Sequence, residues 1–270
     1  MQPMERRAVL TLGAMLAAAA TGSEALAQSQ SAPARSMPEV PPDAPKVAML
    51  VYPKMVALDL IGPMTVFNIL RFNVQLVWKD KTPVATDVGI PIAPTQSFAE
   101  CPKDLDILFV PGGILGTVDC MNDEDVCAFL ADRGARARWV TGVCTGTLVL
   151  AAAGLLRGYK ATSHWAVTDL LPLMGADFVE GRVIQDRNRL TGGGVTAGID
   201  FGLTLAGLMK GEEAARRVQL LIEYAPAPPF NSGTPREAGP ELVAGLRKAR
   251  SAMDGRAREA AEAAAKRLGI

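Results

Sequence analysis

From Lys46 onward, short apolar runs alternate with longer segments of helical periodicity, and this alternation constrains the fold more than any other feature of the sequence. Residues 47–52, 106–110 and 139–143 are apolar runs of the kind expected for strands buried on both faces. Such strands, separated by helices, are typical of a parallel sheet covered by helices. We therefore predict one α/β domain over residues 46–235.

The remaining predicted elements continue this alternation. Residues 73–78 form a strand, residues 83–99 a short antiparallel excursion, and residues 183–190 a hairpin that leads into a helix. The predicted helices cover residues 62–70, 123–137, 148–156, 196–209 and 212–224.

The first 27 residues have the three parts of an export signal peptide. These are Arg6-Arg7, the apolar run 8–20 and the small-residue site Ala25-Leu26-Ala27. The run is shorter than the roughly 20 residues of a membrane-spanning helix, so we expect a cleaved leader, no stable membrane anchor and a periplasmic or secreted protein. The paired arginines favour twin-arginine export. A buried alanine-rich first helix is the alternative.

Two further segments flank the domain. Residues 28–45 hold five prolines among Ser, Ala and Gln, a composition that predicts a disordered linker. Residues 236–270 predict a helical tail whose apolar stripe is narrow and rich in alanine. This tail packs on the domain, packs on a second subunit, or stays loose.

Charge and composition exclude several classes of function. The sequence contains 28 basic residues (Lys and Arg) and 28 acidic residues (Asp and Glu). The formal net charge is therefore zero, and the chain has no excess positive charge to attract nucleic acid. His164 is the single histidine, which excludes sites built on two or more imidazoles, and the four cysteines form no C-x-x-C pair. We therefore expect neither a metal site nor a nucleic-acid partner.

Cys144 is the most informative residue for chemistry, because it lies between a predicted strand and a predicted helix. At such an elbow the side chain stands at the carboxyl edge of the sheet, where α/β folds bind ligands. Gly142 and Gly146 suit a sharp bend, and the helix N-terminus is expected to stabilise a thiolate. The alternative is a small apolar residue that fills a tight turn.

Three further positions are predicted at the same edge. Asp59 lies among aliphatic residues, where burial raises the pKa of a carboxyl and favours acid/base chemistry; the alternative is a cap for the helix that begins near Gly62. The N–H groups of Gly112 and Gly113 could approach a substrate closely, or the pair could simply form a tight turn.

His164, twenty residues beyond Cys144, is the last candidate. It could orient a thiolate or contact the substrate, or it could be a packed, hydrogen-bonded residue beside Trp165.

At these residues the sequence resembles the ThiJ/PfpI superfamily and, within it, the isonitrile hydratase branch. The resemblance covers about residues 46–233. It is carried by Leu58-Asp-Leu-Ile-Gly-Pro63, Val110-Pro-Gly-Gly113, Val143-Cys-Thr-Gly-Thr-Leu148, Ser163-His-Trp165, Thr191-Gly-Gly-Gly-Val195 and Glu223-Tyr-Ala-Pro-Ala-Pro-Pro-Phe-Asn231.

The resemblance implies a flavodoxin-like sandwich, a homodimer, no cofactor and a small-molecule substrate. It implies Cys144 as the nucleophile, Asp59 as its acid/base partner and Thr145 as an active-site side chain. The expected reaction is the hydration of isonitriles to N-formamides. The alternatives are a glyoxalase-, deglycase- or amidase-like cysteine enzyme of the same superfamily and a non-catalytic sensor or binding protein.

Overall fold

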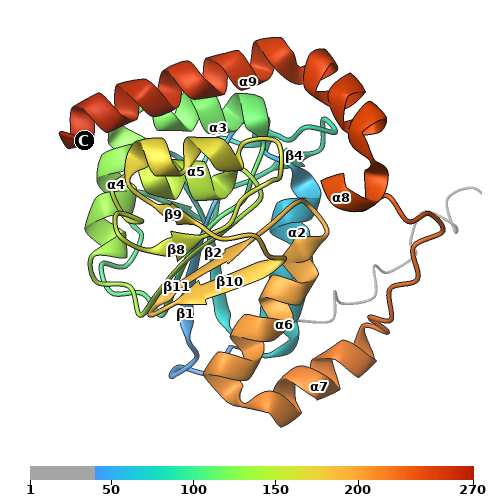
Figure 1. Cartoon of the computed structure of the whole chain (residues 1–270). Coiled ribbons are helices and arrows are strands. Elements are labelled where there is room, and N and C mark those ends of the chain that lie inside the picture. The colour runs from blue at the N-terminus through green and yellow to red at the C-terminus, as the bar shows by residue number, and fades with distance from the viewer. Residues whose placement is uncertain (1–39) are drawn as a thin grey trace, which may run out of the picture. The chain divides into compact units, whose positions relative to one another are not determined.

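A computed structural model describes residues 40–270, in which seven strands form the central sheet (Figure 1). The sheet has the order β10-β11-β7-β6-β1-β2-β5. All neighbours pair in parallel except β10 and β11, which form an antiparallel hairpin. The predicted flavodoxin-like architecture, a mostly parallel sheet with helices on both faces, is confirmed. The predicted leader and residues 28–39 of the predicted linker lie outside the described residues.

The three central strands of this order, β7, β6 and β1, are buried almost throughout, because helices cover both faces of the sheet. Together with the outer strands they build the main core. The seven strands are β1 (Lys46–Leu50), β2 (Asn73–Trp78), β5 (Gln96–Ser97), β6 (Ile107–Val110), β7 (Trp139–Val143), β10 (Val183–Asp186) and β11 (Arg189–Gly192).

Two layers of helices enclose this sheet (Figure 1). One layer contains α2 (Ala57–Ile69), α6 (Ala197–Lys210) and α7 (Glu212–Leu221), with α6 packed between the other two. The other layer contains α3 (Ile114–Met121), α4 (Glu124–Gly134) and α5 (Gly146–Ala152), which pack against one another.

Shorter elements complete the unit. The predicted excursion is present as the antiparallel pair β3 (Val84–Ala85) and β4 (Pro91–Ile92). The other short elements are β8 (Lys160–Ala161), β9 (Asp177–Phe178), the 3-10 turns η1 (Thr168–Leu170) and η2 (Pro172–Met174), and α8 (Pro235–Ala238).

Several helix boundaries differ from the predictions, among them the end of α7, which stops at Leu221. Helix α2 begins five residues before Gly62, so that Pro63 lies inside it. Helix α4 is capped by Asp123, as its acidic first turn predicted, but it ends at Gly134. Helix α5 starts directly after the elbow and ends before Gly154, whose φ of 77° stops the helix.

Helix α3 was missed altogether by the sequence prediction. It starts directly after Gly113 and carries no acidic residue in its first turn. Without a capping side chain or a charged first turn, the segment lacks the usual signals of a helix start.

The predicted tail forms α9 (Pro240–Leu268), and its two halves differ. The second half docks through buried alanines, namely Ala257, Ala260, Ala261 and Ala264. In the first half Leu242 and Leu246 remain exposed. Of the three alternatives, docking on the chain's own domain is therefore observed for the second half. Within residues 40–270 no helix combines the length and apolarity that a bilayer crossing requires.

Candidate functional site

Cys144 occupies a strained elbow between β7 and α5, as predicted. Its φ is 54°, a left-handed conformation that costs a side-chain-bearing residue about 1–3 kcal/mol. The backbone N–H of Cys144 donates to the carbonyls of Gly192 (3.1 Å) and Gly193 (2.7 Å), which helps to hold this conformation. A Cβ at Gly146 would lie 2.3 Å from the carbonyl oxygen of Val110, so the bend needs glycine there.

Asp59 approaches the elbow from the first turn of α2. It does not cap that helix, because the N-cap position is Val56 and the Asp59 carboxylate instead accepts the Gly112 N–H at 2.9 Å. The capping alternative is therefore wrong. A Cβ at Gly112 would lie 2.6 Å from Asp59 Oδ2 and 2.7 Å from Cys144 Cβ, so carboxyl and cysteine converge on one point beside Gly112.

Complete burial controls the titration of this carboxyl. Asp59 is fully shielded from solvent, and its Oδ1 has no hydrogen-bond partner in the described residues. Burial raises the pKa of Asp59 to about 7, although the Gly112 N–H and the Cys144 thiol lower it in part. The sequence-based expectation of a raised carboxyl pKa is met.

The Cys144 thiol titrates differently from the prediction. Only 5% of the residue is exposed, and this burial, followed by the Asp59 carboxylate, raises the thiol pKa above its ordinary value. The Thr145 N–H opposes the shift but does not overcome it. The predicted lowering of the thiol pKa by the helix N-terminus is therefore present, but burial outweighs it.

Thr145 is the centre of a buried hydroxyl network. Its Oγ1 accepts the Gly113 N–H at 2.9 Å and lies 2.7 Å from Thr117 Oγ1. Thr117 Oγ1 in turn lies 3.3 Å from the hydroxyl of Tyr52, which donates to the Pro111 carbonyl at 2.7 Å. Sequence reasoning missed Thr117 and Tyr52, since Thr117 lies on the unpredicted helix α3 and no local motif marks either residue.

Gly112 and Gly113 have a different structural role from the one predicted. The N–H of Gly112 is bound by Asp59 and that of Gly113 by Thr145, so neither is free for a substrate. Gly113 has a φ of 150°, and a Cβ there would lie 2.5 Å from Met55 Cα. The pair is required for close packing, which corrects its predicted use as a substrate donor.

His164 lies near the elbow but does not hydrogen-bond to the thiol. Its Nδ1 accepts the Ala166 N–H at 3.2 Å, and burial, followed by the charge of Arg250, lowers its pKa to about 4. The imidazole is therefore neutral near pH 7. Its neighbour Ser163 makes the contact with the elbow, through a 2.7 Å hydrogen bond from Oγ to the Cys144 carbonyl.

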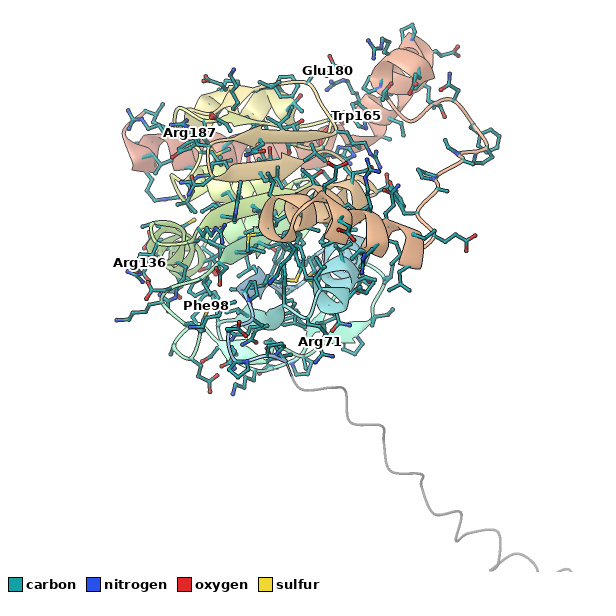
Figure 2. All side chains as sticks on the ribbon, turned by 90° about the horizontal axis from the view of Figure 1, so that it is seen from below. Arg71, Phe98, Arg136, Trp165, Glu180 and Arg187 are labelled. Carbon is teal, nitrogen blue, oxygen red and sulfur yellow. The ribbon has the colours of Figure 1, made fainter. Side chains whose placement is uncertain are left out.

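A cavity of about 480 Å³ adjoins the elbow on the side of Ser163 and Gly193. Trp165 and Glu180, both labelled in Figure 2, contribute to its wall together with His164. The side chains of Cys144 and Asp59 do not line this cavity. The structure thus brings together Cys144, Asp59, Thr145, Gly112 and Gly113, and places His164 in the adjacent wall.

The described part of the chain contains no group of three or more His, Cys, Asp or Glu side chains arranged to hold a metal ion. The arrangement that it does contain is one buried thiol, one buried acid of near-neutral pKa and a hydroxyl network. Together these groups can exchange a proton and form a covalent bond to an electrophilic carbon.

Several known proteins are similar to this chain in sequence and in fold. The chain matches the DJ-1/PfpI family over residues 45–207. It is 50% identical over 204 residues to isonitrile hydratase from Pseudomonas putida, covering 75% of this chain and 89% of that protein. It is 31% identical over 184 residues to the HTH-type transcriptional regulator GbdR from Pseudomonas aeruginosa, covering 66% of this chain and 47% of the regulator.

Among solved structures, the crystal structure of a ThiJ/PfpI family protein from Pseudomonas syringae superposes with a TM-score of 0.79 at 43% identity. That match covers 84% of this chain and 98% of the other. The fold, the elbow and the sequence matches agree with the resemblance found in the motifs. The chain belongs to the DJ-1/PfpI family.

Proposed function

We propose that this protein hydrates isonitriles, R–N≡C, to N-formamides, with Cys144 as the nucleophile and Asp59 as the acid and base. The observation that carries the proposal is the meeting of Asp59, whose pKa is raised to about 7, with a buried thiol at a strained elbow. The 50% identity to isonitrile hydratase supports the same reaction.

The first step is addition of the thiol to the terminal carbon of the isonitrile. The Asp59 carboxylate takes the thiol proton, and the sulfur forms a bond to that carbon. The addition leaves an electron pair on the carbon, which takes the proton from Asp59. The product is a thioimidate, R–N=CH–S–Cys144, and Asp59 is again a carboxylate.

The second step uses the same carboxylate as a base toward water. Asp59 removes a proton from water while the oxygen attacks the thioimidate carbon, and it delivers that proton to the nitrogen. The hydroxyl proton of the resulting adduct then passes to sulfur as the C–S bond breaks. This releases R–NH–CHO and restores the thiol, so that one water is consumed for each isonitrile.

Thr145 and the adjacent cavity have supporting parts in this proposal. The Thr145 hydroxyl holds the Gly113 N–H and keeps the elbow aligned with α3, while its backbone N–H faces the sulfur. We assign the substituent R to the cavity beside Ser163 and His164, because Ser163 and Gly193 in its wall hydrogen-bond to the backbone of Cys144.

Intact-mass analysis after addition of an isonitrile tests residue and reaction together. The wild type should form the N-formamide from alkyl and aryl isonitriles and carry a thioimidate on Cys144 during turnover. Asp59→Ala should form both far more slowly, because it lacks the group that takes the thiol proton. Cys144→Ala should show neither adduct nor product. Absence of formamide from a folded wild type, over several isonitriles, would refute the proposal.

The same preparation separates the alternatives. Turnover of glyoxals with Cys144-dependent kinetics would favour a glyoxalase-like enzyme. Binding of a small molecule without turnover would favour a sensor, a possibility supported by the match to the GbdR regulator.

We further propose that the protein acts as an exported homodimer. Leu58 and Ile61 expose 47% and 40% of their surface on the helix that carries Asp59, which supports a second copy covering this face. Light scattering on the purified protein tests the dimer. The N-terminal mass of the protein recovered from its native host tests the cleavage of residues 1–27.

A further inference from the structure

The docked half of α9 lies against the two helices that follow the site. It packs on α3 and α5 and on the turn η2, with its buried alanine face toward them. The small side chains allow close approach but supply little specific bonding. The polar contacts of α9 therefore decide how firmly these helices are held.

Arg267, in the last turn of α9, makes the most connected of these contacts. Its Nη2 donates to the carbonyl of Met121 at 3.1 Å and to the carbonyl of Ala152 at 3.3 Å, and lies 3.6 Å from the Cys127 sulfur. Met121 is the last residue of α3 and Ala152 the last residue of α5. One guanidinium thus joins the C-termini of both helices, where the orphan carbonyls and the negative dipole ends favour a cation.

The opposite ends of the same helices hold the site. Helix α3 starts directly after Gly113 and carries Thr117, and α5 starts directly after Cys144 and Thr145. The two helices are bridged near these ends by the 2.7 Å contact between Thr117 and Thr145. A helix of this length is a rigid rod of about 12 Å, so a displacement at one end reaches the other.

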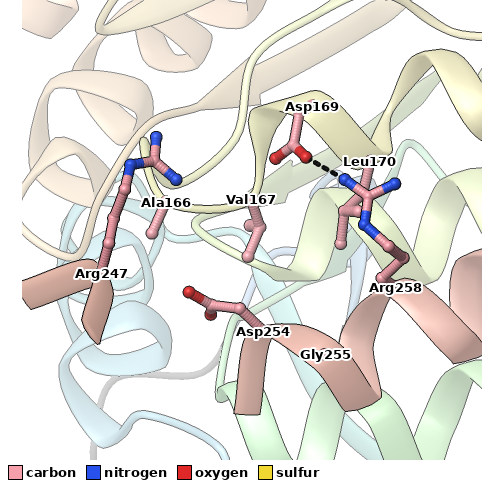
Figure 3. A pocket seen from close by; sticks show the side chains of 8 residues that line it. All are labelled: Ala166, Val167, Asp169, Leu170, Arg247, Asp254, Gly255 and Arg258. Atoms are coloured by element: carbon pink, nitrogen blue, oxygen red, sulfur yellow. Dashed lines mark hydrogen bonds and ion pairs between the residues drawn. The ribbon is translucent and has the colours of Figure 1, made fainter. Parts of the chain in front are cut away.

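Helix α9 also holds the segment that supports the elbow from the other side. Arg258 pairs with Asp169 (Figure 3), and the Arg247 guanidinium lies 5.3 Å from the centre of the Trp165 ring. Both contacts border a cavity of about 160 Å³ between α9 and η1. The segment that they hold begins at Ser163, whose hydroxyl binds the Cys144 carbonyl.

We infer that the C-terminal helix is a working part of the site and that Arg267 is a positioning residue for the Cys144 elbow. By joining the C-termini of α3 and α5, it preserves the alignment of Thr117, Thr145 and Cys144 at their N-termini. Catalytic power depends on such alignment, since an error of about 1 Å can cost about a hundredfold in rate. The inference rests on the proposed function only for its kinetic readout.

The experiment compares Arg267→Met and Arg267→Lys with two controls. Arg256→Ala changes an exposed arginine of the same helix for which the described residues show no ion-pair partner. Val218→Ala opens a cavity in the small cluster between α2, α6 and α7, away from α3 and α5. It controls for general loss of stability. Each variant is assayed for kcat and KM with an isonitrile, for thermal unfolding, and for alkylation by iodoacetamide well below the unfolding temperature. Peptide mass mapping separates the label on Cys144 from that on Cys101, Cys120 and Cys127.

For Arg267→Met we expect kcat to fall about tenfold with KM within about twofold, and Cys144 alkylation to rise about threefold as the elbow loosens. Arg267→Lys should recover part of both effects. If Arg267→Met and Val218→Ala lose similar stability and also show the same kcat and the same Cys144 alkylation, the inference is overturned. Should even the wild type make no formamide, the proposed function fails, and alkylation alone decides the inference.

Discussion

Two buried thiols in different surroundings show what distinguishes a reactive position. Cys101 lies in the loop between β5 and β6, and Cys144 directly follows β7 at the carboxyl end of that strand. Burial raises the thiol pKa of both. Arg133 lies near Cys101 and lowers its pKa in part, whereas the Asp59 carboxylate raises that of Cys144 further.

By charge alone, Cys101 has the better environment for a thiolate. However, no acid that could take and return its proton acts on the pKa of Cys101, and the residue lies in a loop instead of at a strand-helix elbow. Cys144 has that acid, a strained elbow and a neighbouring cavity. The comparison indicates that a shared proton, more than a stabilised thiolate, defines the proposed nucleophile.

Replacement of each thiol in turn by alanine tests this comparison most strongly. Cys144→Ala should lower formamide production by at least about a thousandfold, because no other group can form the covalent bond. Cys101→Ala should keep kcat/KM within about threefold of the wild type, since its thiol is only packed. Product formation is measured by chromatography against a formamide standard. Similar losses in both variants would show that the effect is structural.

The buried acid should make the stability of the fold depend on pH. The Asp59 pKa rises from 3.8 to about 7 on folding, so the folded protein retains a proton that the unfolded chain releases between these values. Stability therefore falls as pH rises from about 4 to about 7, by at most about 4 kcal/mol for this group. Urea unfolding of wild type and Asp59→Asn at about pH 5 and about pH 8 measures the difference.

In Asp59→Asn this pH-dependent loss should disappear, while the amide oxygen can still accept the Gly112 N–H. No buried acid of this kind acts on the pKa of Cys101. An unchanged pH slope in the variant would show that Asp59 titrates near its ordinary pKa in the folded protein.

The same carboxyl should control the pH dependence of the reaction. Since the ionised form takes the thiol proton, kcat/KM should rise with pH through about 7. Asp59→Asn should lose this step and fall about a hundredfold in kcat/KM. A profile that keeps its rise near pH 7 in the variant would assign that step to another group.

Removal of one hydroxyl from the network behind Thr145 should have a smaller effect. Thr117→Val keeps the shape of the side chain but removes the 2.7 Å contact to Thr145. We expect about 1 kcal/mol of lost stability and a decrease in kcat of up to about tenfold. Thermal unfolding and steady-state kinetics give the two values. Wild-type kinetics in this variant would remove Thr145 alignment from the proposed mechanism.

The smallest effect is expected at Gly255 in α9. A Cβ at Gly255 would meet no atom within 4 Å, so Gly255→Ala gains helix propensity without a clash. The free energy of unfolding should increase by about 1 kcal/mol, with activity unchanged. Urea titration measures this gain. A loss of stability instead would mean that the small cavity beside Gly255 is filled in solution.

Much of this molecule could be predicted because its signals are local. Continuous apolar runs identified the central strands, and the strand-glycine-cysteine-glycine pattern identified the elbow. The boundaries of α2 and α5 moved because tertiary contacts decide where the first turn begins. Helix α3 was missed because its N-cap position is Gly113, where close packing leaves no room for a side chain, so the sequence shows no capping residue.

By itself, the sequence determined the α/β architecture and the family, since periodicity and motif order need no coordinates. It also predicted that Cys144 and Asp59 lie at the same edge of the sheet. Only the tertiary structure decided that Asp59 binds the Gly112 N–H instead of capping a helix, and that the Gly113 N–H is already bound by Thr145. Only the tertiary structure shows that Arg267 joins the C-termini of α3 and α5. The physical reason is that burial, pKa and hydrogen-bond partners depend on which distant segments meet, and no local pattern encodes that meeting.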